Sequence, residues 1–102
     1  MFVYSADREA QDYEAITVST TAIGITVSKM KSSLYGSCTG AFITVEGANI
    51  RFRLDGTDPT TTEGHMLING QNITLSSISD VGKFRAIRDD ATDATLRVTL
   101  RY

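Results

Sequence analysis

The sequence predicts an all-β fold, an antiparallel β-sandwich of seven or eight short strands, immunoglobulin-like or barrel-like. Apolar residues fall on alternate positions in several segments that are too short for helices, which is the period of a strand with one buried face. Gly, Asn, Asp and Ser separate these segments as turns. No convincing helical period follows residue 15, so we expect the apolar faces to pack against one another in a single core.

The chain divides into an N-terminal arm, residues 1–14, and a single domain, residues 15–102. The composition of the arm suits either a short helix or an extended segment. Alternation then predicts one bent strand or two, built on Ile16, Val18, Ile23, Ile25 and Val27. Residues 29–40 show no sustained period, which predicts a loop or a loop with a short edge strand.

The middle of the chain combines alternation with turn chemistry. Residues 41–46 alternate, residues 46–49 suit a turn, and residues 50–54 alternate again, so this stretch predicts a β-hairpin. The second strand ends in a shaped turn because Gly56 tolerates positive φ and Pro59 fixes its own φ. The residues of this structural turn are Asp55, Gly56, Thr57, Asp58, Pro59 and Thr60, and we add His65, which follows Gly64.

Four further strands are expected at residues 66–68, 73–78, 83–88 and 94–102, with turns between them. In the last strand Leu96, Val98 and Leu100 face one way, while Arg97, Thr99 and Arg101 face the other. The predicted core consists of Ile16, Val18, Ile23, Ile25, Val27, Ile43, Val45, Ile50, Phe52, Leu54, Ile73, Leu75, Phe84, Ala86, Leu96, Val98 and Leu100.

Composition excludes several classes of protein. The chain has 102 residues, enough for one domain with one core. Its 10 basic and 12 acidic side chains give a net charge of −2, which argues against a nucleic-acid-binding protein. No apolar run approaches the ~18 residues of a membrane span, and Met1 is followed by no extended apolar signal core. We expect synthesis and folding in a reducing cytosol.

Few residues offer chemistry. Cys38 and His65 are the only residues of their kinds, so a nucleophilic dyad would need both; a semi-buried apolar thiol and a loop-fixing histidine are the favoured interpretation. Asp55, Asp58 and Glu63 are hard carboxylates in one loop, but their spacing does not match a calcium-binding loop, and turn capping explains them better. We expect no catalytic residue, no metal and no cofactor.

The strand and turn at residues 50–60 resemble the β module at the C-termini of chitobiases and β-hexosaminidases, which carries a DGTDPT-like turn. The longer run 41–68, together with residues 84–88 and 91–99, resembles a family of small virion proteins of tailed phages. This resemblance covers residues 41–102. It implies a non-enzymatic structural protein assembled into the virion in the host cytoplasm, and a capsid decoration (cement) protein in particular, with a neck or tail component as the alternative.

Carbohydrate binding is the second alternative, since the chitobiase-like module accompanies sugar-active domains. Sugar sites usually use flat aromatic side chains, and this chain has no Trp. Its four tyrosines, Tyr4, Tyr13, Tyr35 and Tyr102, suit a protein interface equally well.

The favoured partners are the major capsid protein or other virion proteins, and copies of this chain. Charge is distributed unevenly: the first fourteen residues carry four acids and one base, whereas seven of the ten basic residues lie from Arg51 onward. Outward-facing arginines are expected to form basic rows, and the N-terminal arm supplies apolar anchors and the opposite charge. The candidate interface residues are Phe2, Val3, Tyr4, Asp7, Glu9, Arg51, Arg53, Arg97 and Arg101.

Overall fold

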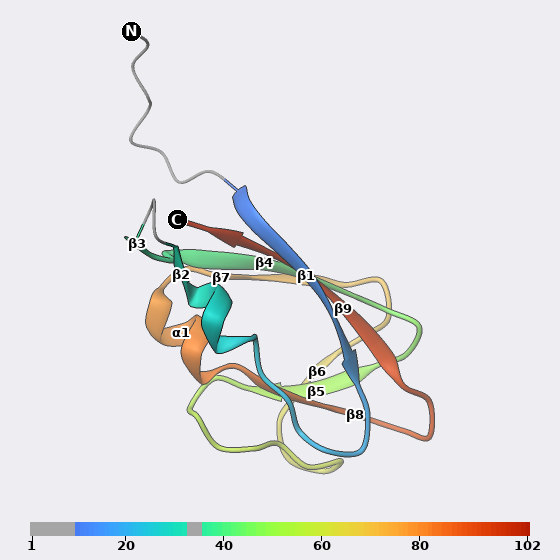
Figure 1. Cartoon of the computed structure of the whole chain (residues 1–102). Helices are drawn as coiled ribbons and strands as arrows, with labels where there is room; N and C mark the ends of the chain where they lie inside the picture. The colour runs from blue at the N-terminus through green and yellow to red at the C-terminus, as the bar shows by residue number, and fades with distance from the viewer. Residues whose placement is uncertain (1–9, 33–35) are drawn as a thin grey trace, which may run out of the picture.

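The computed structural model describes residues 10–32 and 36–102, which form an antiparallel β-sandwich (Figure 1). The large sheet has the strand order β1-β9-β4-β7 and consists of β1 (Ala10–Val18), β9 (Ala94–Arg101), β4 (Gly40–Glu46) and β7 (Asn72–Leu75). The small sheet has the order β6-β5-β8 and consists of β6 (His65–Leu67), β5 (Ile50–Arg53) and β8 (Arg85–Arg88). The predicted fold class is confirmed.

Three short elements complete the fold. A 3-10 helix, η1, spans Val27–Met30 and leads into a two-stranded hairpin of β2 (Lys31–Ser32) and β3 (Gly36–Ser37). One α-helix, α1, spans Ile78–Lys83 and connects the large sheet to the small one. In the described part of the chain no helix is long and apolar enough to cross a membrane.

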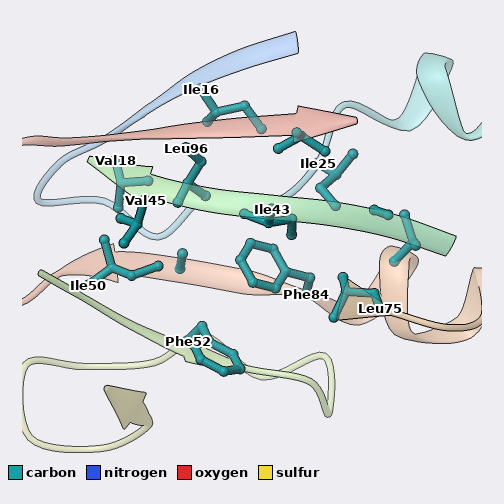
Figure 2. Packing of buried hydrophobic residues seen from close by; sticks show 14 of the residues in the cluster. Ile16, Val18, Ile25, Ile43, Val45, Ile50, Phe52, Leu75, Phe84 and Leu96 are labelled. Carbon is teal, nitrogen blue, oxygen red and sulfur yellow. The ribbon is translucent and has the colours of Figure 1, made fainter. Parts of the chain in front are cut away.

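The inner faces of the two sheets meet in one apolar core (Figure 2). Most of the predicted core residues are buried, including the inward row Leu96, Val98 and Leu100 of β9. Leu54 and Ile73 are only partly buried against the core. The prediction is wrong for Ile23 and Val27, which are 37% and 79% exposed. Buried residues that the prediction omitted are Cys38, Ala41, Leu67, Val81 and Ala94.

The predicted strand through residues 23–27 is also wrong. Only Ile23 pairs, in an isolated bridge where its N–H and C=O exchange hydrogen bonds with Ala86 of β8 (2.9 and 2.8 Å). The chain then crosses the side of the sandwich, buries Ile25, and turns into η1. This segment therefore joins two layers rather than extending one sheet, which is why its alternation does not bury every second residue.

The predicted hairpin of residues 41–54 is a corner between the two sheets. β4 lies in the large sheet and β5 in the small one, and they do not pair with each other. The corner after β4 is tied to the corner before β7: the Asn69 N–H donates to Asn49 Oδ1 (2.8 Å), and the Gly47 N–H donates to Asn69 Oδ1 (3.1 Å). These reciprocal side-chain bonds satisfy backbone groups that a hairpin ladder would otherwise use.

The expected strands on either side of α1 are shorter than predicted. β7 ends at Leu75, where residues 73–78 were expected to continue the strand, and β8 begins at Arg85 rather than at residue 83. Ser77 caps the helix, its Oγ accepting the Asp80 N–H (3.1 Å), and Val81 anchors the helix in the core. A Ser three residues before an acid is a sequence signal for the start of a helix, and Ser77 and Asp80 form this pair at the start of α1.

β1 begins at Ala10, so residues 10–14 belong to the large sheet, although the sequence placed them in the arm. Two acids of this strand bind the crossing segment of residues 19–30. The Glu14 carboxylate accepts both the N–H and the hydroxyl of Thr26 (3.0 and 2.6 Å), and the Lys29 ammonium pairs with Asp12 (3.2 Å). Two of the four acids of the predicted arm are thus used within the fold.

Acid is expected to destabilise the protein through Asp12. The Tyr13 N–H and the Lys29 ammonium hold the pKa of Asp12 below its ordinary value of 3.8 in the folded state. The folded chain therefore binds fewer protons than the unfolded chain, so this stabilisation is present above that value and is lost as pH falls through the folded pKa. Thermal unfolding followed from neutral pH to about pH 2 should show the difference in Tm between native protein and Asp12→Asn shrinking with acid. A constant difference would contradict this role.

Candidate functional site

The structural turn after β5 is held by its own polar groups. The Arg53 guanidinium pairs with the Asp55 carboxylate, with Nε 3.1 Å from Oδ1, and this arginine holds the pKa of Asp55 below its ordinary value. Gly56 has a φ of +83°, which a residue with a side chain rarely adopts. Thr60 Oγ1 accepts the N–H groups of Thr62 and Glu63 (3.2 and 3.0 Å). The turn is a self-capped unit.

The same turn is fastened to the rest of the sandwich. Arg85 Nε donates to Asp58 Oδ1 (2.8 Å), and its NH2 group donates to the Ala22 carbonyl (3.1 Å). Pro59 is buried. Asp55 and Asp58 are each paired with an arginine, and within the described ranges no three His, Cys, Asp or Glu side chains gather closely enough to hold a metal ion.

Cys38 and His65 lie in different surroundings. The Cys38 side chain is buried, its N–H donates to the Met30 carbonyl, and burial raises the pKa of its thiol. A raised pKa leaves less of the reactive thiolate at neutral pH. His65 is exposed at the start of β6, and its ring packs on Phe52 with centroids 5.4 Å apart. The structure thus places the histidine beside the turn but gives the thiol no base among the described hydrogen bonds.

An open pocket of about 570 Å³ lies between the turn and β6. Its lining combines Arg53 and Asp55, already paired with each other, with Glu63 and His65. The pocket is therefore polar, and its arginine is paired with a carboxylate of the turn.

The predicted arginine rows have the expected register. Arg51 and Arg53 alternate with buried Ile50 and Phe52 on β5, and Arg97 and Arg101 alternate with buried residues on β9. The expectation that these rows present positive charge is wrong for three of the four. Their acidic partners are Asp89 for Arg51 (3.0 Å), Asp55 for Arg53 and Glu46 for Arg97 (3.0 Å). No ion pair of Arg101 occurs within the described residues. Phe2, Val3, Tyr4, Asp7 and Glu9 lie outside the described residues.

The structure brings together a surface that the sequence did not predict, on the outer face of the large sheet. The strand register aligns Tyr13, Thr99, Phe42 and Thr74 in one row across all four strands. A second row aligns Ala15, Arg97, Thr44 and Asn72, and Thr17 lies opposite Thr95 beside them. We call this surface the threonine face: Tyr13, Ala15, Thr17, Phe42, Thr44, Asn72, Thr74, Thr95, Arg97 and Thr99.

Arg97, the charged residue of the threonine face, is held by hydrogen bonds to two neighbouring side chains. Arg97 donates to the Tyr13 hydroxyl (3.0 Å) and to Glu46 Oε1 (3.0 Å), and both partners raise its pKa. Tyr13 remains 50% exposed. Alternation predicted Arg97 and Thr99 to point outward, but the sequence placed Tyr13 in the arm, and only the strand order shows that these residues are neighbours.

Comparisons with protein-family models, with curated proteins and with solved structures gave no match to this chain.

Proposed function

We propose that this protein is a non-enzymatic structural protein of a tailed-phage particle, and within that class a capsid decoration protein. The resemblance of residues 41–102 to small virion proteins supports the class. The observation that carries the proposal in the structure is the threonine face, because it suits docking against another folded protein. Tyrosine and arginine are common in such interfaces, and here Tyr13 is half exposed beside Arg97.

Burying this face against a partner costs little free energy, for two reasons. Threonine is β-branched and already restricted at χ1, so an interface loses little side-chain entropy by ordering it. The single ion pair, Arg97–Glu46, is made within the chain, so a partner need not supply a counter-charge. A sheet surface with these properties fits a shell of many repeated protein contacts.

The surroundings of Cys38 and His65 support the non-enzymatic part of the proposal. The thiol has a raised pKa and is buried, while the histidine ring rests on Phe52. A purified chain that turned over an ester, peptide or glycoside, and lost that activity on His65→Ala, would contradict this part.

The expected result in particles is a high copy number. Quantitative mass spectrometry of purified virions should find hundreds of copies for a capsid decoration protein and about a dozen or fewer for a neck component. We further propose that Phe2, Val3 and Tyr4 anchor the chain to a neighbouring subunit, with Asp7 and Glu9 assisting. Deleting residues 1–9, which spares β1, should then preserve the circular dichroism spectrum but lower occupancy; unchanged occupancy at low and high salt would rule out this anchor.

Glycan binding is the second candidate function, and the pair Tyr13 and Phe42 favours it. Thr99 lies between them in the register, so the two residues are two strands apart, roughly 10 Å across the sheet. A glycan array followed by calorimetry separates the candidates. A dissociation constant tighter than millimolar that Tyr13→Ala abolishes would favour the glycan over the protein partner.

A further inference from the structure

The two lateral sides of the sandwich are built differently. β1 and β8 contact each other, so these edge strands share one side, and the strand orders place β7 and β6 on the other. A strand at the edge of a sheet presents unpaired N–H and C=O groups, which are a template for adding another strand. Which edge is open therefore decides where another strand can add.

The side with β1 and β8 is closed. The crossing segment lies along β8, where Ile23 bridges Ala86 and the Arg88 N–H donates to the Ser19 carbonyl (3.1 Å). On β1 the register shifts between Ala10 and Asp12, and such irregularities block edge pairing. Asp12 and Glu14 also stand opposite buried residues of β9, so they are inward-pointing charges at an edge.

The side with β6 and β7 is open in the described structure. β7 pairs with β4 alone, and its sequence Asn72-Ile73-Thr74-Leu75 contains no charge and no proline. Ile73 points toward the core but is only partly buried. Exposed apolar side chains flank the strand: Met66 and Ile68 precede it, at 38% and 49% exposure, and Ile78 follows it at 41%. The edge thus has none of the features that blunt the opposite side.

We propose that β7 pairs with β7 of a second copy of this chain, antiparallel and about a two-fold axis at Ile73. In a two-fold contact the residue on the axis meets its own copy, so a charge there would face a like charge, and each residue beside the axis meets a residue of the same short segment. Residues 66–79 contain no charged side chain, so this segment meets that requirement. A partner of opposite charge has nothing to recognise along it.

The alternation of β7 also fits this axis. With Ile73 opposite its own copy, Asn72 of one chain lies opposite Thr74 of the other, and both point to the solvent face. The two partly buried Ile73 side chains then meet on the core side. Ile68 precedes the turn that leads into β7 and Ile78 begins α1 after it, so an exposed isoleucine lies before and after the strand in the chain. The two large sheets become one continuous sheet.

Sedimentation equilibrium of the full chain, from about 1 to about 500 µM, tests the pairing. We expect a reversible dimer with a micromolar dissociation constant. Asn72→Lys with Thr74→Lys sets two like-charge pairs across the axis and should weaken the dimer about tenfold, less at high salt. The matched control, Asn72→Asp with Thr74→Lys, sets two opposite-charge pairs instead and should dimerise at least as tightly as the native chain. Both side chains are exposed, so circular dichroism and Tm should confirm that each variant folds.

Three results would overturn the proposal. The native chain could remain monomeric throughout this range. Both double variants could dimerise like the native protein, which would place the contact elsewhere. Both could lose the dimer equally, which would exclude the two-fold register. None of these results bears on where the protein acts, so the inference stands or fails separately from the proposed function.

Discussion

Replacing Phe84 by alanine is expected to lower the free energy of unfolding by about 3–5 kcal/mol, because it removes a large fully buried side chain and leaves a cavity. Phe84 is 1% exposed and stacks on Phe52 of the small sheet, with ring centroids 5.8 Å apart. Figure 2 shows its ring in the middle of the core, beneath Ile43 of the large sheet. The side chain thus packs between the two layers.

The free energy of unfolding of a typical domain is about 5–15 kcal/mol, so losing about 3–5 kcal/mol of it is a large effect. The Tm of Phe84→Ala should fall by at least about 12 °C. Chemical denaturation of native protein and Phe84→Ala measures it directly. Val27→Ala is the matched control, since alternation placed Val27 in the core whereas the structure leaves it 79% exposed. That variant should change stability by less than about 0.5 kcal/mol. Equal losses for the two variants would contradict the packing described above.

Val27 also shows where sequence patterns stop being informative. Alternation correctly predicted the inward rows of β4, β5 and β9, because each of these strands lies in a sheet with one face on the core. The run Ile23, Ile25 and Val27 has the same period. It fails because this segment crosses between layers, where the partner of each residue depends on the path of the chain and not on local sequence.

The corner between β4 and β5 illustrates the same limit. The sequence identified the turn correctly, and Gly47 has the positive φ, +91°, that such a turn needs. A hairpin and a corner between sheets share both the turn chemistry and the inward alternation, because both strands face one core in either case. The distinction comes from long-range pairing: β4 lies between β9 and β7, and β5 between β6 and β8.

The sequence predicted which way the arginines of the candidate interface point, but it did not predict that acidic side chains neutralise three of the four. The outward positions of Arg51 and Arg97 follow from alternation. Their carboxylate partners, Asp89 and Glu46, are 38 and 51 residues away along the chain, so only the folded structure shows that these arginines are neutralised. The threonine face has the same origin, since its rows run across four strands that are distant in sequence.

The second large effect is expected at Gly40, where any side chain would collide with the neighbouring backbone. A Cβ atom built on Gly40 lies 2.4 Å from the carbonyl oxygen of Leu75, closer than non-bonded atoms approach. The obstructing atom belongs to the main chain of β7 and cannot rotate away. Gly40→Ala should therefore displace the end of β7 from β4 and cost about 3 kcal/mol, at the upper end for overpacking.

Gly82→Ala is the matched control for this prediction. Gly82 lies in α1, nothing stands within 4 Å of its Cβ position, and alanine favours the helix by about 0.5–1 kcal/mol, so this variant should be more stable than the native protein.

Hydrogen exchange locates the effect of Gly40→Ala: protection should fall at amides of β7 and of the facing half of β4, while β5 and β8 keep theirs. A Gly40→Ala protein with native stability and native protection in β7 would show that the close approach of Leu75 to Gly40 is not a fixed feature of the fold. Because β7 is also the proposed pairing edge, its displacement should weaken the dimer as well, in proportion to the protection lost there.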